Sequence, residues 1–197
     1  MDDTIKTGLT ESLSVVQHLV DDPSVQQRVD EVAALMTASL KQGGCIYFCG
    51  NGGSAADAQH LAAELSGRFN FERDPLSAEA LHCNTSYLTA VANDYGYEFV
   101  YSRMIEGRAK PGDVLVGITT SGNSRNVCLA LQAGRQRGMK TVAMTGRSGG
   151  QAAQYADVLL NVPSDQTPRI QEAHILLGHL FCASVERAMF PSLNATK

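Results

Sequence analysis

The chain has few basic residues and no long apolar run, and each shortage excludes a class of protein. Of its 197 residues, 16 are Lys or Arg and 20 are Asp or Glu, which gives a net charge of -4. Proteins that bind nucleic acid need clustered basic side chains to neutralise phosphates, so we expect no nucleic-acid partner. A membrane helix needs about 20 apolar residues in succession, and because no run approaches this length we expect no membrane partner.

Two nucleotide-binding motifs and the cysteine spacing of a zinc knuckle are also missing. Neither GxGxxG nor GxxxxGK[ST] occurs, which argues against a dinucleotide or a P-loop nucleotide as ligand. The five cysteines stand mostly in apolar runs, so we expect reduced core thiols and a cytoplasmic protein. The polar and acidic segment MDDTIKTGLTES predicts no signal peptide, which agrees with that location.

The remaining composition is that of one globular domain. Apolar residues make up 44 % and charged residues 18 %, and the length suits a single core. Residues 4–20 repeat apolar positions with a helical period, and Asp22-Pro23 predicts the N-cap and first residue of a second helix that ends at Gly43-Gly44. The apolar stripe of this helical pair fits two roles, a subunit interface or packing onto the chain's own sheet.

Strands alternate with helices in the rest of the chain. Apolar runs predict strands at 46–48, 114–118, 140–145 and 158–162. Helices are expected from residue 54, after Asn84, at 98–109, after residue 124 and at 167–190. A charged loop covers 69–82 and ends in a short apolar run at 78–81. This alternation predicts an α/β fold with a central parallel sheet flanked by helices in three layers.

Residues 49–69, CGNGGSAADAQHLAAELSGRF, read as a strand end, a glycine-rich turn and a helix. Glycines let the backbone approach a ligand closely, and the first amides of a helix favour an anion. Ser54 is expected to be the N-cap of this helix. His60 and Glu64 lie four residues apart on one helical face, a spacing that suits metal chelation, shared acid–base work or a solvated surface without such a role.

A second turn, ITTSGNS at 118–124, also follows a predicted strand and precedes a helix. Its four hydroxyls and the free amides of the helix suit either an oxyanion cradle or an ordinary capped turn. Because both turns lie at the carboxyl ends of parallel strands, one anionic small molecule can be held between them.

Four segments, CGNGGSAADAQHLAAEL, VANDYGYEFVYSR, ITTSGNS and RIQEAHILLGH, resemble the sugar isomerase (SIS) domains, and within them the phosphoheptose isomerases. The match covers nearly the whole chain. It implies a three-layer SIS-type fold with two extra N-terminal helices, in a single domain over 1–197. Residues 1–43 would form a helical pair for packing or oligomerisation and 44–190 the α/β core. The resemblance further implies a cytosolic homotetramer with one Zn²⁺ per subunit.

The activity that the resemblance implies is ketose–aldose isomerisation in heptose biosynthesis. D-sedoheptulose 7-phosphate would become D-glycero-D-manno-heptose 7-phosphate through a metal-assisted enediolate, with Glu64 at the base of a dry cleft as the proton carrier. Two alternatives are a non-catalytic SIS interaction protein of the replication-initiator-associating type and an isomerase of another sugar phosphate. Retention of Glu64 and its expected neighbours argues against the non-catalytic protein.

The family pattern also implies roles for individual residues. It assigns the metal to His60, Glu64, Gln171 and His179, and the acid–base pair to Glu64 and His179. Substrate would be bound by Asn51, Gly52, Gly53, Ser54, Glu64, Asn93, Asp94, Thr119, Thr120, Ser121, Ser124 and Gln171. The sequence departs from many relatives at Thr119, where Ser is common, and at Pro168, where an Asp often stands; the proline instead predicts the start of the last helix.

Helical geometry raises a question about the implied metal ligands. Gln171 and His179 are eight residues apart, which is about 12 Å along a helix and about 80° around it. We therefore hypothesise that one ligand comes from a neighbouring subunit, with His174 as a competing ligand from the same helix. A ligating nitrogen of His179 cannot carry a proton at the same time, so the two roles of this residue would alternate. Arg68 and Arg169 either neutralise the substrate phosphate or form structural ion pairs.

Overall fold

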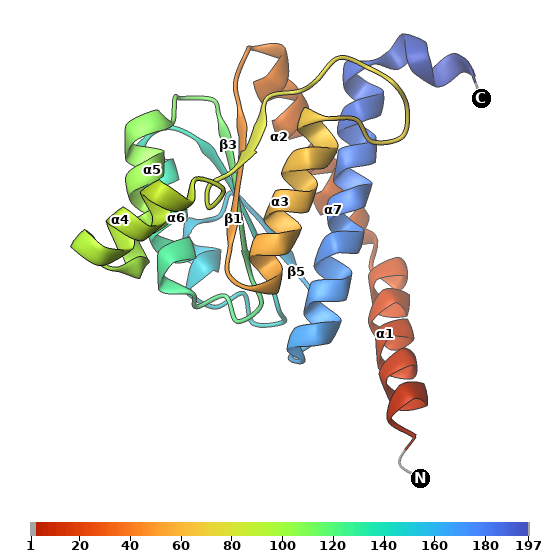
Figure 1. The fold of residues 1–197 in the computed structure, drawn as a ribbon. Helices are drawn as coiled ribbons and strands as arrows, with labels where there is room; N and C mark the ends of the chain where they lie inside the picture. The colour runs from red at the N-terminus through yellow and green to blue at the C-terminus, as the bar shows by residue number, and fades with distance from the viewer. Residues whose placement is uncertain (1–2, 197) are drawn as a thin grey trace.

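A five-stranded parallel sheet forms the centre of the computed structural model, which describes residues 3–196 (Figure 1). Its strands are β1 (Ile46–Gly50), β2 (Ala78–Ala80), β3 (Val114–Thr119), β4 (Lys140–Thr145) and β5 (Val158–Asn161). They lie in the order β2-β1-β3-β4-β5, and every neighbouring pair is parallel. After β1 the chain adds β2 on one side of β1 and then crosses back to add β3 on the other side. The carboxyl ends of β1 and β3 therefore form a topological switch point, where open α/β sheets bind ligands.

Helices cover both faces of this sheet and complete three layers (Figure 1). One layer contains α2 (Pro23–Lys41), α3 (Gly53–Ser66) and α7 (Thr167–Met189); the other contains α4 (Thr85–Tyr95), α5 (Val100–Arg108) and α6 (Arg125–Gln136). Alternate residues of β1 face opposite layers: Ile46 and Phe48 pack with the first, Tyr47 and Cys49 with the second. The predicted three-layer α/β fold is therefore confirmed.

The two N-terminal helices differ in how they pack. Helix α2 buries Val32 and Met36 completely in the core beneath the sheet. Helix α1 (Thr4–Asp21) buries only Val15 and Leu19 among its described residues, and its N-terminal half extends past the carboxyl edge of the sheet (Figure 1). Four of its apolar side chains remain exposed: Ile5, Leu9, Leu13 and Val20. Packing onto the chain's own sheet is thus correct for α2, whereas the stripe of α1 has no cover in the single chain.

Most predicted helix starts are confirmed, and one cap is wrong. Asp22 caps α2 and Asn84 caps α4, each through a side-chain oxygen that accepts a backbone N–H. Ser54 is not the N-cap of α3; Gly52 holds that position at φ +56°, and Ser54 is buried in the first turn. The helix expected at 98–109 begins at Val100, after the short 3₁₀ helix η1 (Tyr97–Phe99). Strand β2 lies in the short apolar run at the end of the predicted loop over 69–82 and was not predicted as a strand.

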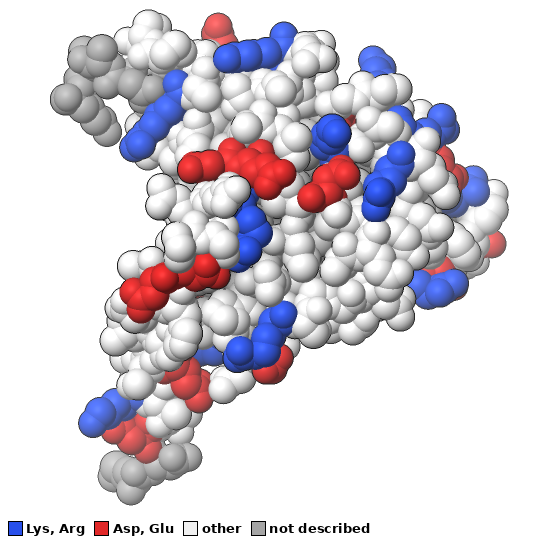
Figure 2. Space-filling model, turned by 180° about the vertical axis from the view of Figure 1, so that it is seen from behind, with Lys and Arg blue, Asp and Glu red and all other residues white. Residues whose placement is uncertain are grey.

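Charged side chains are interspersed over the face opposite that of Figure 1. Figure 2 shows lysines and arginines there beside aspartates and glutamates, with uncharged surface between them. No helix among residues 3–196 is long and apolar enough to cross a membrane. On the face shown, no continuous basic surface for a polyanion is formed.

Candidate active site

The two ligand-binding turns predicted from the sequence are joined by a pair of amides. Asn51 Nδ2 donates to Asn126 Oδ1 at 2.9 Å, and Asn126 Nδ2 donates to Asn51 Oδ1 at 2.8 Å. The hydroxyl of Tyr97 also donates to Asn51 Oδ1, at 3.3 Å. Asn126 was not predicted as a site residue, because an Asn at the second position of a helix has no distinctive sequence signal. These contacts hold the glycine-rich turn after β1 beside the hydroxyl-rich turn after β3.

The glycines of the first turn are needed for close approach. Gly52 has a positive φ of +56°, and a Cβ on Gly53 would lie 2.5 Å from the side-chain Nε2 of Gln171. The Gln171 amide therefore lies directly against the backbone at the start of α3. This helix has no side-chain cap; the N–H groups of Ser54 and Ala55 donate instead to the carbonyl oxygens of Asn51 and Gly52 in the turn, each at 3.0 Å.

The second turn combines hydroxyls with an uncapped helix. Thr119 Oγ1 is 2.9 Å from Ser124 Oγ; Thr119 is buried, Thr120 and Ser124 are half-buried, and Ser121 is exposed. The N-cap residue of helix α6, Ser124, makes no side-chain cap hydrogen bond, in contrast to the capped helices α1, α2 and α4, although the N–H of Val127 donates to Asn126 Oδ1 at 3.0 Å. Unsatisfied N–H groups and the partial positive charge at the N-terminus of a helix favour an anion. The geometry suits a phosphate.

Three potential metal ligands converge two turns further along α3. His60 Nε2 lies 2.9 Å from Glu64 Oε1 and 3.3 Å from the Nε2 of His179 on α7. One ligand atom from each of the three residues lies within 4.8 Å of the other two. Helices α3 and α7 lie side by side (Figure 1). They can pack closely because residue 178 is a glycine; a Cβ there would lie only 2.6 Å from the side chain of Leu61.

The three side chains His60, Glu64 and His179, hereafter the triad, fit a divalent cation. Two imidazole nitrogens and a carboxylate oxygen are typical zinc ligands, and in a tetrahedral site with bonds of about 2.1 Å such atoms are about 3.4 Å apart. A single imidazole Nε2 carries one proton or one lone pair, so the Nε2 of His60 cannot both donate to Glu64 and accept from His179. A shared cation would satisfy all three atoms at once.

Three of the four implied metal ligands, His60, Glu64 and His179, meet within one chain. No hydrogen bond within residues 3–196 joins Gln171 to the triad, and its amide lies instead against Gly53. His174, the competing ligand, is fully buried and lies 3.1 Å through Nε2 from the carbonyl oxygen of Thr145. A carbonyl only accepts, so Nε2 carries the proton, and burial lowers the pKa of His174 to about 4. His174 faces the sheet and is not a ligand.

The triad is partly open to solvent in the single chain. The side chain of His60 is 48 % exposed and that of Glu64 is 23 % exposed, so the expected dry cleft is not formed by one chain alone. The ring of Phe69 stacks on the His179 imidazole, with centroids 5.6 Å apart and planes at 26°. This ring covers one face of the His179 imidazole.

Asn93 and Asp94 lie apart from the two turns in the hydrogen-bond network. They occupy the last turn of α4, are exposed and pair with each other, with Asn93 Nδ2 donating to Asp94 Oδ1 at 2.8 Å. No hydrogen bond among residues 3–196 joins either side chain to the glycine-rich or hydroxyl-rich turn. The connection runs through Tyr97, three residues after Asp94, whose hydroxyl contacts Asn51.

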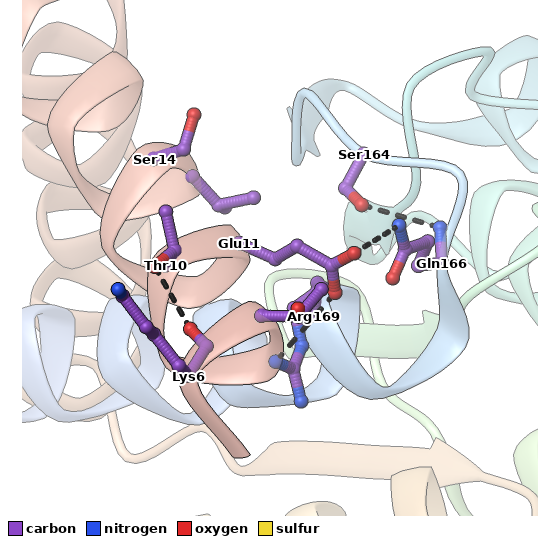
Figure 3. A pocket seen from close by; sticks show the side chains of 9 residues that line it. Lys6, Thr10, Glu11, Ser14, Ser164, Gln166 and Arg169 are labelled. Carbon is purple, nitrogen blue, oxygen red and sulfur yellow. Dashed lines mark hydrogen bonds and ion pairs between the residues drawn. The ribbon is translucent and has the colours of Figure 1, made fainter. Parts of the chain in front are cut away.

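A cavity of about 500 Å³ opens elsewhere, between α1 and the segment that leads into α7 (Figure 3). Arg169 there donates to the carbonyl of Gly8 and to Glu172, the latter at 2.7 Å. Gln166 donates to Glu11 at 3.3 Å across the same gap, as the dashed line in Figure 3 shows. The bond to Gly8 attaches α7 to α1, and Arg169 forms structural ion pairs with Glu172 on its own helix and with Glu11 on α1. Arg68 likewise pairs with an exposed glutamate.

All five cysteines are unpaired thiols. Cys49, Cys128 and Cys182 are buried, Cys45 is half-buried and Cys83 is exposed. Burial raises the pKa of the Cys182 thiol, which lies close to Glu64, so this thiol stays protonated beside the triad. The expectation of unpaired core thiols is confirmed for the three buried cysteines, whereas Cys83 is exposed.

Comparison with known proteins identifies the family. The model of the SIS domain family matches residues 12–146. A phosphoheptose isomerase of Akkermansia muciniphila is 56 % identical over 162 residues, 82 % of this chain and 86 % of that protein, and one of Mycobacterium bovis is 50 % identical over 95 % of both chains. The solved phosphoheptose isomerase of Neisseria gonorrhoeae superposes with a TM-score of 0.87 at 44 % identity, over 93 % of this chain and 97 % of that one. The chain therefore belongs to the phosphoheptose isomerase family of SIS-domain proteins, and it is an isomerase.

Proposed function

We propose that this isomerase converts D-sedoheptulose 7-phosphate into D-glycero-D-manno-heptose 7-phosphate. Relatives named phosphoheptose isomerase that share 50 to 56 % of their residues with this chain support the substrate class. The observation that carries the proposal is the triad, because two of its residues, His60 and Glu64, lie on α3, the helix that begins at the glycine-rich turn. An anion cradle beside a proton-carrying carboxylate is what the isomerisation of a sugar phosphate requires.

Glu64 is the residue that moves the proton between carbons. Its Oε1 faces His60, while Oε2 has no hydrogen-bond partner within residues 3–196 and is free to meet the substrate. In a ketose–aldose interconversion, Glu64 takes a proton from the carbon next to the carbonyl and returns it to the neighbouring carbon. A positioned acid or base of this kind typically contributes a factor of about 100 to 10,000 in rate.

The triad and Gln171 are the residues that would hold a metal. A divalent cation bound there would polarise the substrate carbonyl as a Lewis acid. The Nε2 of His179 faces His60, so while Nε2 is a metal ligand, a proton that His179 exchanges with a substrate hydroxyl would be held at Nδ1.

The two turns bind and orient the substrate. The hydroxyls of Thr119, Thr120, Ser121 and Ser124 and the uncapped start of α6 bind the phosphate. Asn51, held by Asn126 and Tyr97, and the backbone of Gly52 and Gly53 contact the sugar.

The working form that we propose is a homotetramer in the cytoplasm. The exposed apolar stripe of α1 supports assembly, because apolar side chains at helical spacing gain stability when another subunit covers them. The five unpaired cysteines suit a reducing compartment. Assembly would also exclude water from the triad, which one chain leaves partly open.

The proposal is tested by turnover of sedoheptulose 7-phosphate, with the two sugar phosphates separated by chromatography. We expect conversion by the zinc-loaded protein, and a loss of at least about 100-fold for Glu64→Gln, in line with the contribution of a positioned base. Chelator-treated protein should lose most of the rate and recover it with zinc. Glu72→Gln, on an exposed side chain eight residues away, is the matched control and should keep full activity. No conversion by the zinc-loaded protein would favour a non-catalytic interaction protein.

A further inference from the structure

A buried ion pair joins the ends of α3 and α7 behind the triad. Arg73 and Glu186 are both fully buried, with Arg73 Nε 2.9 Å from Glu186 Oε1. The guanidinium also donates to the carbonyl oxygens of Glu64 at 2.8 Å, Leu65 at 2.9 Å and Gly67 at 3.0 Å. Arg73 therefore satisfies carbonyls that the end of α3 leaves unpaired, including that of a triad residue.

The other partner of the pair fixes the loop that follows α3. The Glu186 carboxylate accepts the backbone N–H of Phe69 at 3.0 Å and that of Asn70 at 2.8 Å. Each of these bonds has a charged acceptor and is shielded from water, which makes it stronger than a neutral bond. The backbone of Phe69 is thus attached to α7 on one side and, through Arg73, to α3 on the other.

The side chain of Phe69 connects this fixed backbone to the triad. Its ring stacks on His179, with centroids 5.6 Å apart and planes at 26°, and His179 in turn meets His60 edge to face at 5.1 Å and 62°. A phenyl ring has neither donor nor acceptor. It therefore fixes the plane of the imidazole without drawing either nitrogen into a competing hydrogen bond.

We propose that Phe69, Arg73 and Glu186 are positioning residues for the metal-binding triad. The buried ion pair fixes the backbone of Phe69, and the Phe69 ring holds the His179 imidazole so that its Nε2 faces the Nε2 of His60. Residues that orient metal ligands typically change metal affinity by about 10- to 100-fold when they are replaced. This inference rests on the metal site in the proposed function and adds the residues that keep its geometry.

The test compares two leucine substitutions in the same loop. Phe69→Leu keeps an apolar side chain but removes the ring that stacks on His179. Phe71→Leu makes the same change at a half-buried ring that stacks on no residue of the triad within residues 3–196. Zinc affinity is measured by competition with a chromogenic chelator. We expect Phe69→Leu to bind zinc about 10- to 100-fold more weakly than the wild-type protein, the range for residues that orient metal ligands. Phe71→Leu should have the zinc affinity of the wild-type protein, and so should Phe69→Tyr, which keeps an aromatic ring.

Steady-state kinetics separate a positioning role of Phe69 from a general effect of the substitution on folding. Phe69→Leu should lower kcat at saturating zinc and leave KM unchanged, because the two turns that bind substrate are not altered. Equal zinc affinity in Phe69→Leu and the wild type, or an equal loss in Phe71→Leu, would overturn the inference.

Failure of the metal site itself gives a different result. If the wild-type protein binds no zinc, the proposed metal site is wrong, and the imidazole signals of His179 in the NMR spectrum of the metal-free proteins decide the positioning role. We then expect one sharp set of signals in the wild type and Phe69→Tyr, and broadened or multiple sets in Phe69→Leu. A single sharp set in all three proteins would contradict the positioning role.

Discussion

At the level of single residues, His174 shows how burial fixes a protonation state. Its side chain is fully buried, its Nε2–H donates to the carbonyl of Thr145, and its Nδ1 has no hydrogen-bond partner within residues 3–196. A charged imidazole in this place would be separated from water, which is why the pKa falls from 6.5 to about 4. His174 is therefore a neutral packing residue between α7 and the end of β4.

This pKa shift predicts a pH dependence of stability. Between pH 6.5 and about 4 the unfolded chain binds a proton at His174 and the folded chain does not, so stability falls as the pH falls through this range. The shift corresponds to a loss of about 2 kcal/mol between pH 8 and pH 5. Urea unfolding of the wild type and of His174→Gln, which can still donate to Thr145, measures the difference. An equal pH dependence in the two proteins would contradict the prediction.

Asn126 is the residue through which the two turns contact each other. Asn126→Ala removes both amide hydrogen bonds to Asn51, and a lost pair of this kind costs about 1 to 3 kcal/mol. We expect kcat/KM for the sugar phosphate to fall about tenfold, since about 1.4 kcal/mol corresponds to that factor. Gln136→Ala, at the exposed end of α6, is the control. Wild-type kcat/KM in Asn126→Ala would show that the pair does not position Asn51.

At the level of elements, the ends of α3 and α7 depend on one buried ion pair. Glu186→Gln leaves the Arg73 guanidinium buried without its counter-ion, and breaking a buried pair on one side typically costs about 3 to 5 kcal/mol. We expect a reduction of this size in the free energy of unfolding, measured in urea. The exposed ion pair between Arg68 and Glu72 offers the contrast, because Glu72→Gln should change stability by less than about 1 kcal/mol. Equal effects of the two substitutions would argue against a structural role for the buried pair.

Elements whose limits are set by local chemistry could be predicted from the sequence. Asp22-Pro23 and Asn84 mark helix starts because a short acceptor side chain satisfies amides only a few residues away. The apolar runs of β3 and β4 identify strands buried on both faces. The α/β alternation, and with it the edge of the sheet where the turns meet, follows from such local signals.

Elements and contacts that depend on distant segments could not be predicted. Strand β2 has only three residues, AEA, and is a strand because it pairs with β1. The N-cap of α3 is Gly52 and not Ser54, because the positive φ of Gly52 permits a tight turn that the residue pattern of the sequence does not reveal. The contacts Asn51–Asn126 and Phe69–His179 exist only once whole elements pack, which is why sequence reasoning found neither Asn126 nor Phe69.

At the level of the whole molecule, the largest row of exposed apolar side chains on one helix is the stripe along α1. Ile5, Leu9, Leu13 and Val20 follow one another at helical spacing and are 79, 67, 66 and 72 % exposed. The face of α1 that packs on the body carries Val15 and Leu19 instead, so the stripe is not needed to hold α1 in place. Covering a large apolar side chain gains about 1.5 to 3 kcal/mol, so this stripe favours contact with further subunits.

A substitution in the stripe should therefore separate the proposed tetramer without unfolding the subunit. Leu9→Glu and Leu13→Glu place charges where another subunit would bury apolar surface, and we expect a smaller assembly by light scattering coupled to size exclusion. Ser14→Glu adds the same charge on the polar face of α1 and should leave the assembly unchanged. Because assembly would close the triad from solvent, the smaller species should also lose turnover while keeping its helical circular dichroism. A wild-type protein that is monomeric, or a tetramer that survives both leucine substitutions, would show that α1 serves another purpose.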